Sequence, residues 1–346
     1  MAYTNIKKPS EYFNTKLYTG NGTSGTDITG VGFQPDWLWI KERSSTSSHF
    51  IYDSIRGVNV KLSSNTTDAD STVSDSMTSF NSDGFTVGNN GATNENSQTY
   101  ASWNWLANGA GVANTDGSIS STVSANTTSG FSIVTWTSTG SAHTVGHGLN
   151  STPAMIIMKG RHEANSWMVY HHKNTSAPET DYLELNSTAA TADYTVWNDT
   201  APTSSVFSLG TWSGNDAGGT MVAYCFAEKQ GYSKFGSYLG NGNADGTFIY
   251  TGFKPAFFVV KPYSTTGNWY CWDSKRSPIN EIDGKYLELD ASGAEAGTSS
   301  VVDLDFLSNG VKLRNTGGGF NGSGVSFIYM AFAEQPLVGD NPATAR

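Results

Sequence analysis

Cysteine and charged residues are both scarce in this chain of 346 residues. It has 2 Cys, and Asp, Glu, Lys and Arg together make up 14% of it. A secreted scaffold held by disulfides carries at least one pair in each module. Cys225 and Cys271 fall in two different apolar stretches, so we expect two buried thiols rather than a disulfide framework.

Long apolar runs and basic clusters are also missing. No stretch reaches the roughly 18 apolar residues of a membrane span. The start, residues 1–8, is not followed by the apolar segment of a signal peptide. We therefore expect synthesis in a cytoplasm without secretion. The net charge is −10 with a pI near 5.0, and no Lys/Arg stripe is present. Nucleic acid is thus excluded as an expected partner, because phosphate binding needs such a stripe.

The residues that are abundant favour β-structure. The chain has 38 Gly, is rich in Ser, Thr and Asn, and is 12% aromatic. Many turns between short strands, with large flat side chains for the core, are typical of all-β proteins. We find no pattern for a helix of three turns.

One pattern occurs three times along the chain. A proline, five mostly apolar residues and a lysine form residues 35–41, 153–159 and 255–261. An aromatic residue precedes each proline at the same spacing, and each copy closes on an aromatic strand. The preceding aromatics are Tyr18, Trp136 and Tyr238, and the closing strands are residues 103–107, 224–228 and 329–334. Arrays of similar modules usually serve as spacers or multivalent binders.

We divide the chain accordingly and predict an all-β protein of three tandem antiparallel β-sandwiches of jelly-roll or lectin-like type. The predicted units are a docking arm (1–16), a first repeat (17–112), a linker with the second repeat (113–231), and a third repeat with a C-terminal tail (232–346). The proline-to-lysine strands are apolar on both faces, which predicts central strands. Ser82-Asp83-Gly84 and Ser308-Asn309-Gly310 predict matched hairpins.

Two Asp–Arg pairs stand at matched positions of the first and third repeats. Asp53 and Arg56, and likewise Asp273 and Arg276, follow a strand aromatic. Each pair could form a structural ion pair that closes a loop. Alternatively, the carboxylate could bind sugar hydroxyls beside a stacking aromatic ring. The second repeat departs from this pattern at His171.

Further candidates lie in the second repeat. Trp197 and Trp212 belong to its least-matched part, so we expect them to be exposed and available to a glycan. His162, His171 and His172 with Glu163 match no standard ligand spacing, so no metal is predicted. No nucleophile elbow or phosphate-binding loop is present, so no catalytic residue and no cofactor are predicted.

Several stretches resemble a β-rich module of virion proteins of tailed bacteriophages of aquatic bacteria, such as tail-fibre-like structural proteins. The resemblance rests on residues 18–23, 30–41, 53–57 and 332–339. It implies a virion location after synthesis in the bacterial host. It supplies no set of functional residues.

The leading expectation is a tail-fibre or appendage subunit that attaches to other virion proteins through its N-terminal arm and contacts host surface glycans. A homo-oligomer, favouring a trimer, is expected, because strands apolar on both faces could serve an interface. One alternative is a capsid or tail decoration protein, or a connector, without a ligand. Another is a polysaccharide depolymerase, which would need a carboxylate pair.

Overall fold

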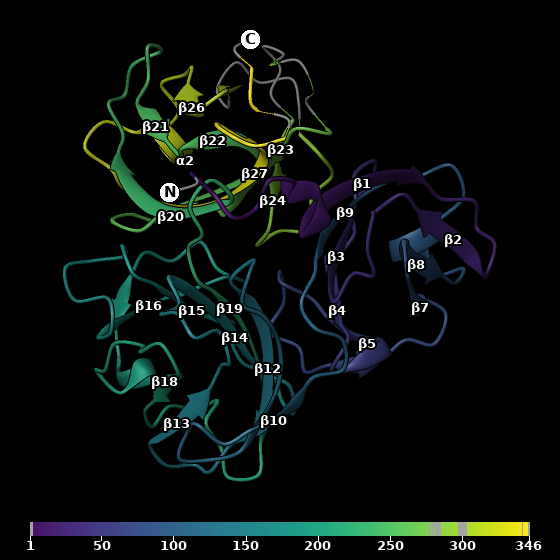
Figure 1. Cartoon of the computed structure of the whole chain (residues 1–346), viewed down its shortest axis with the longest axis vertical. Helices are drawn as coiled ribbons and strands as arrows, with labels where there is room; N and C mark the ends of the chain where they lie inside the picture. The colour runs from purple at the N-terminus through teal and green to yellow at the C-terminus, as the bar shows by residue number, and fades with distance from the viewer. Residues whose placement is uncertain are drawn as a thin grey trace.

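The computed structural model describes residues 3–276, 278, 280, 285–296, 303–340 and 342–344. Figure 1 shows three lobes around a common centre, for which we keep the names first, second and third repeat. The opening strand of the first begins at Phe13, inside the predicted docking arm (1–16), because it pairs with the closing strand of that lobe. The described residues form β-strands, turns and a few single helical turns. Every ladder between named strands in this part of the chain is antiparallel. The all-β prediction is confirmed. The ends of the predicted arm and tail, residues 1–2, 341 and 345–346, lie outside the described residues.

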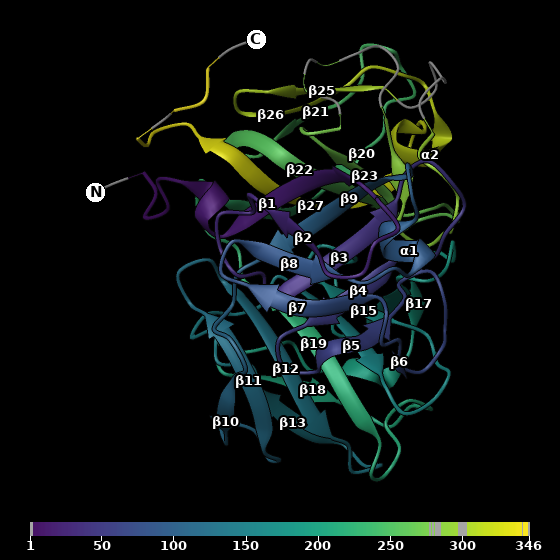
Figure 2. The same ribbon diagram turned by 90° about the vertical axis from the view of Figure 1, so that its right-hand side faces the viewer.

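The first repeat has a large sheet and a small one. The large sheet runs in the order β1 (Phe13–Thr19), β9 (Thr99–Trp105), β3 (Trp37–Glu42), β4 (Phe50–Asp53), β5 (Gly57–Leu62) and β6 (Ser71–Thr72). The small sheet consists of β2 (Thr26–Thr29), β8 (Gly84–Val87) and β7 (Met77–Asn81). Figures 1 and 2 show the small sheet on the outer side of the large one.

The second repeat keeps this order and extends it at one edge. Its large sheet is β10 (Val112–Asn114), β11 (Ser121–Asn126), β12 (Phe131–Thr137), β19 (Thr220–Phe226), β14 (Met155–Gly160), β15 (Met168–His171), β16 (Asp181–Glu184) and β17 (Ala192–Asp193). Its small sheet has only β13 (His143–Gly146) and β18 (Val206–Leu209). A 3₁₀ turn, η2 (Thr195–Trp197), lies near β18.

The third repeat again has both sheets. The large one is β20 (Ser233–Leu239), β27 (Ser326–Pro336), β22 (Phe253–Pro262), β23 (Tyr270–Asp273) and β24 (Leu287–Glu288). The small one is β21 (Phe248–Tyr250), β26 (Gly310–Leu313) and β25 (Leu304–Leu307). Thus the opening strand, the closing strand and the proline-to-lysine strand are neighbours in all three large sheets.

Local predictions from the sequence agree with these sheets. The proline-to-lysine strands β3, β14 and β22 lie inside their sheets and are buried almost throughout. The two predicted hairpins connect β7 to β8 and β25 to β26. The α-helices of the described residues, α1 (Gly91–Asn94) and α2 (Gly318–Asn321), have four residues each. Both thiols are free and buried, as predicted.

The interior of the molecule is shared between the repeats. The largest apolar cluster takes side chains from all three large sheets, among them Trp37, Tyr224, Phe226, Phe257 and Phe332. Three smaller clusters each use one repeat alone, on the side of its small sheet. The large sheets therefore bury one face against each other and the other against their own small sheets. This shared cluster was not expected from the repeat pattern.

The N-terminal segment packs onto the third repeat of its own chain. The Tyr3 hydroxyl donates to the Gly252 carbonyl oxygen at 2.6 Å. Ile6 is buried in the shared cluster, and η1 (Pro9–Glu11) lies against β27. Figure 1 shows this purple segment crossing the upper lobe before it enters β1. Its expected attachment to other virion proteins stays a prediction.

No helix among the described residues is long and apolar enough to cross a membrane.

Candidate functional site

A ring of hydrogen bonds joins the three repeats. One ring N–H at a matched position of each repeat donates to a backbone carbonyl of another repeat. Trp167 Nε1 donates to Ser63 at 2.9 Å, Trp269 Nε1 to Glu184 at 2.8 Å, and His49 Nε2 to Glu288 at 3.0 Å. The second repeat thus contacts the first, the third contacts the second, and the first contacts the third.

The protonation state of His49 is fixed by its neighbours. Trp39 Nε1, which can only donate, lies 2.7 Å from His49 Nδ1, so that nitrogen accepts and Nε2 carries the proton. Burial lowers the pKa of His49 to about 3, which keeps the ring neutral. His49 therefore serves the same purpose as the two tryptophans at the matched positions.

The Asp–Arg pair of the first repeat is a buried ion pair. Asp53 Oδ2 accepts from Arg56 Nε at 2.5 Å, and both side chains are fully buried. Arg56 Nη2 also donates to the Ile51 carbonyl at 3.0 Å. The Tyr224 hydroxyl, from the closing strand of the second repeat, donates to Asp53 Oδ2 at 2.8 Å. The pair thus holds a loop and joins two repeats.

The pair of the third repeat has the same geometry. Asp273 Oδ2 accepts from Arg276 Nε at 2.5 Å, and both side chains are fully buried. Arg276 Nη2 donates to the Cys271 carbonyl at 3.0 Å. Trp103 Nε1, from the closing strand of the first repeat, donates to Asp273 Oδ2 at 3.0 Å. Neither pair is accessible to a glycan, so the geometry favours the ion-pair alternative over the sugar-binding one.

There is a physical reason why the second repeat has His171 where the other repeats have an aspartate. At the matched position of the third repeat's closing strand stands Met330, which has no proton to donate to a carboxylate. His171 instead donates from Nε2 to the Tyr329 carbonyl oxygen at 3.2 Å and accepts from the Lys173 backbone N–H at 3.1 Å. Burial lowers the pKa of His171 to about 3, so the ring is neutral. Asn174 stands where the other repeats have arginine.

Three buried lysines end the proline-to-lysine strands. Lys41, Lys159 and Lys261 are each 0% exposed, and burial lowers the pKa of each to about 8. Lowered lysine pKa values often mark catalytic groups. Here each ammonium donates to backbone carbonyls, at 2.6 Å for Glu42, 2.8 Å for Gly160 and 2.5 Å for Gly267. These contacts hold the loop that follows each strand.

The prediction that Trp197 and Trp212 are exposed is wrong. They are 1% and 7% exposed and belong to the apolar cluster of the second repeat. The small sheet of this repeat has two strands, and Trp197 in η2 covers the large sheet next to it, with its ring edge-on to Tyr170 at 5.7 Å. The poor match in sequence therefore reflects a different way of filling the core.

A cleft in the second repeat brings aromatic and polar side chains to the surface. We call it the aromatic cleft. Its volume is about 360 Å³. Trp212 forms part of its wall, and Tyr194 is 51% exposed. Its lining includes Glu163, Asn165, Tyr182, Glu184, Tyr194 and Trp212. Aromatic faces with carboxylate groups suit a polyhydroxylated ligand, because rings stack on sugars and oxygens bind hydroxyls.

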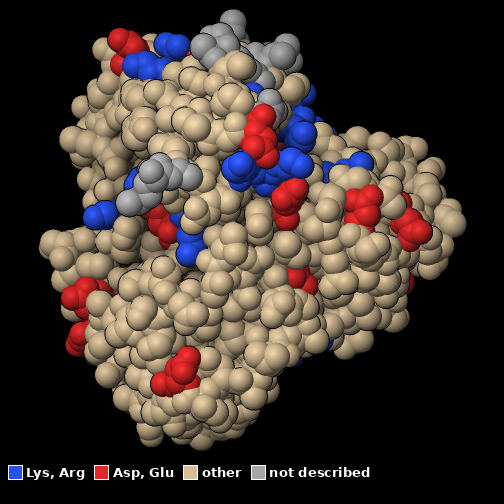
Figure 3. Space-filling model, viewed as in Figure 1, with Lys and Arg blue, Asp and Glu red and all other residues tan. Residues whose placement is uncertain are grey.

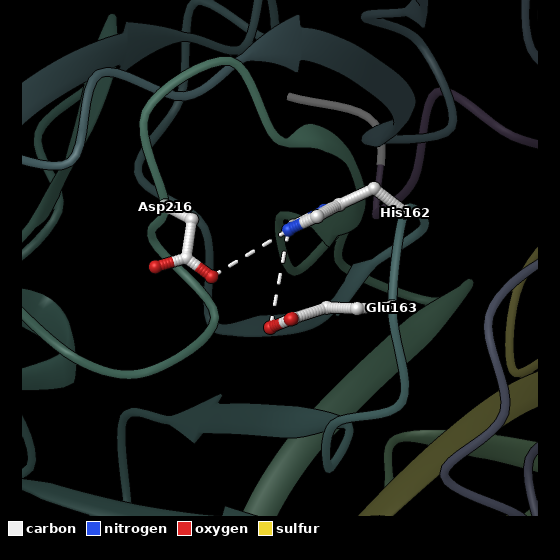
Figure 4. A group of neighbouring side chains, drawn as sticks. All are labelled: His162, Glu163 and Asp216. Atoms are coloured by element: carbon white, nitrogen blue, oxygen red, sulfur yellow. Dashed lines mark ion pairs between the residues drawn. The ribbon is translucent and has the colours of Figure 1, made fainter.

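The histidines considered for a metal site do not gather. His171 and His172 bind backbone carbonyls of the third repeat, the latter that of Phe235 at 2.9 Å. His162 instead lies beside Glu163 and Asp216, with Nε2 3.9 and 3.7 Å from their carboxylate oxygens (Figure 4). Their possible ligand atoms lie within 4.8 Å of one another. His162 and Asp216 are exposed, and exposed groups of this kind are common without an ion. We assign no metal to them.

The described residues define an all-β protein with several antiparallel sheets. The family described as Domain of unknown function (DUF7483) matches residues 8–336, so the chain belongs to this family. The match spans all three repeats. A search of curated proteins found no match.

Of the residues predicted to contact a glycan, Trp212 lines the aromatic cleft, and its role there stays a prediction. The sequence did not indicate the other lining residues. Tyr182 and Glu184 alternate along β16, which puts them on one face, whereas Tyr194 and Glu163 come from separate loops. Only the alternation in β16 is visible in the sequence. The approach of the loops follows from the packing of the second repeat's two sheets.

Proposed function

We propose that this protein is a structural subunit of a tailed-phage virion, a tail fibre or related appendage, and that it contacts host surface glycans. We further propose that each large sheet and its small sheet form a β-sandwich of lectin-like type. The aromatic cleft carries the glycan contact. Stacking of a sugar on Tyr182 or Tyr194, with hydroxyls bound to Glu184, is the ordinary way in which such groups bind saccharides.

The surface supports a binding role. Figure 3 shows one face on which scattered charged side chains interrupt a mostly uncharged surface. A surface of this kind suits contact with hydroxyl-rich material, because neutral saccharides offer hydrogen bonds and apolar ring faces rather than charge. The shared core and the ring of hydrogen bonds hold the repeats in fixed positions, so a ligand meets a rigid surface.

The test is retention of the intact protein on an array of bacterial surface saccharides. We expect retention on a subset of saccharides, and loss of that retention in Tyr194→Ala. Because Tyr194 is exposed, this change should leave the fold intact. Uniform absence of retention, or equal retention by the variant, would overturn the assignment of the aromatic cleft.

The depolymerase alternative is tested in the same assay. Glu163 and Glu184 both line the cleft, and a glycosidase needs two carboxylates. We expect bound saccharides to be recovered intact, without new reducing ends. New reducing ends that disappear in Glu184→Gln would show that the protein hydrolyses the saccharide instead of only binding it.

A decoration or connector role without a ligand is the second proposal. Burial of both Asp–Arg pairs and of Trp197 favours it, because these predicted glycan contacts serve the interior. Electron microscopy of the particle separates the two proposals: an appendage tip supports adhesion, and a regular lattice position supports decoration. A trimer remains part of the first proposal. Its contacts would have to use surfaces other than β3, β14 and β22, which are covered within the chain.

A further inference from the structure

The junction of the third repeat with the first and the junction of the second repeat with the third differ in the space between their matched residues. Where the third repeat meets the first, a small cavity of about 50 Å³ is lined by Ala256, Ser274 and Lys275 of the third repeat. Where the second meets the third, the matched residues Ala154, His172 and Lys173 line a cleft of about 670 Å³. We call it the junction cleft. A contact that is nearly closed at one junction is therefore open at another.

Two tyrosines in the junction cleft have unused hydroxyl groups. Tyr170 and Tyr329 line the cleft and are only 4% and 5% exposed. Within the described residues neither hydroxyl makes a hydrogen bond, and neither is among the completely buried polar atoms without a partner. The Tyr329 hydroxyl reaches over Gly236, where a Cβ would lie 2.5 Å from it. Nearly buried hydroxyls without a protein partner are suited to a ligand in the cleft.

The junction cleft carries a positive charge, whereas the chain as a whole is negative. Lys234 is paired with Glu228 at 2.6 Å, so the charges of these two side chains cancel. Lys173 is exposed and makes no ion pair within the described residues. Its charge therefore remains, in a chain whose net charge is −10. An anion is more favoured here than over most of the surface.

His172 adds an acceptor to this cleft. Its Nε2 donates to the Phe235 carbonyl at 2.9 Å, and burial lowers its pKa, so Nδ1 is left to accept. The cleft thus offers a cation, two phenol groups and an imidazole acceptor around a volume that suits a small oligosaccharide. These groups match a ligand that has many hydroxyls and a carboxylate.

We propose that the junction cleft binds an acidic saccharide, with the Lys173 ammonium on a uronate carboxylate and the Tyr170 and Tyr329 hydroxyls on its ring hydroxyls. The inference deepens the proposed glycan contact and rests on it for the biological source of the ligand. The binding itself does not depend on the aromatic cleft, because the two clefts have no lining residue in common.

The test is titration calorimetry of the intact protein with a hexamer of galacturonic acid and, in parallel, with a hexamer of glucose. We expect the acidic hexamer to bind more tightly, and its affinity to fall as salt is added. Lys173→Glu should weaken binding about tenfold, because a hydrogen bond to a charged group is lost. Tyr170→Phe, which removes only the hydroxyl, should weaken it about threefold without changing denaturant unfolding.

Lys275→Glu is the matched control. It makes the same charge change at the matched position beside the small cavity, so the affinity should stay that of the unaltered protein. Absence of binding, equal binding of both hexamers, or equal losses in the two lysine variants would overturn the inference. Tyr194→Ala separates this inference from the aromatic-cleft assignment. It should leave the acidic hexamer bound even if array binding is lost.

Discussion

The Tyr224 hydroxyl lies 2.8 Å from Asp53 Oδ2 and donates a hydrogen bond from the second repeat to the first. The same carboxylate oxygen accepts from Arg56 at 2.5 Å inside the first repeat. One buried oxygen therefore fixes a loop and a contact between repeats. Trp103 and Asp273 repeat this relation between the first and third repeats at 3.0 Å.

Removal of the Asp53 carboxylate should destabilise the whole protein. We expect Asp53→Ala to lower the free energy of unfolding by about 3–5 kcal/mol, because it leaves Arg56 charged and unpaired in the interior. Tyr224→Phe should lower it by about 1–2 kcal/mol. In the double mutant the two losses should not add, since the groups are bonded. Denaturant unfolding measures all three.

Asp68→Ala is the control for these single and double mutants. Because Asp68 is exposed, removal of its carboxylate should change the free energy of unfolding by less than about 0.5 kcal/mol. Additive losses for Asp53→Ala and Tyr224→Phe would show that the contact between repeats contributes nothing. Glycan retention of a folded Asp53→Asn variant should equal that of the unaltered protein, because the pair is buried.

Acid should destabilise the protein through its buried histidines. Burial lowers the pKa of His49 and His171 to about 3, whereas an unfolded histidine titrates near 6.5. Below about pH 6.5 the unfolded chain therefore binds more protons than the native one, and stability falls as the pH falls. Each histidine contributes about 1.4 kcal/mol per pH unit in the window between the two values.

His171→Gln tests this pH dependence. The amide N–H of glutamine can still donate to the Tyr329 carbonyl, yet the residue does not titrate. We expect a smaller loss of unfolding free energy between neutral and mildly acidic pH than in the unaltered protein. The same substitution at exposed His162 serves as the control. An unchanged slope in His171→Gln would mean that this ring is not kept neutral by burial.

Placing at position 171 of the second repeat the aspartate found in the other two repeats should destabilise the protein. His171→Asp puts a carboxylate opposite Met330, with Asn174 instead of an arginine beside it. We expect a loss of about 3 kcal/mol in unfolding free energy, because the buried charge is unpaired. Adding Asn174→Arg should recover part of the loss. Thermal unfolding of both variants checks this, and a neutral His171→Asp would refute the account of this position.

Much of each repeat was predictable because the information is local. The proline-to-lysine strands have apolar residues on both faces, and this pattern alone predicts that they are buried. The turn between β7 and β8 is likewise predicted by Ser82, Asp83 and Gly84, which are adjacent in the sequence. The Asp53–Arg56 pair is also local, because the two residues are three apart. The spacing alone was therefore enough to suggest that the two residues form a structural ion pair.

The contacts between repeats were not predictable in this way. The sequence does not show that Trp167 reaches Ser63, or that Tyr224 reaches Asp53, because these depend on how three sheets pack around one interior. The error over Trp197 has the same origin. A poorly matched segment indicated exposure, whereas the segment fills the place beside a two-stranded sheet. Both clefts likewise depend on loops that meet only in the folded chain.

Retention on a saccharide array, compared between the unaltered protein and Tyr194→Ala, tests the central claim most directly. The account predicts that a subset of saccharides retains the protein, that these come off uncleaved, and that the variant is no longer retained. If no saccharide retains the protein, or if Tyr194→Ala is retained equally, the aromatic cleft is not a glycan site. The decoration proposal would then stand in its place.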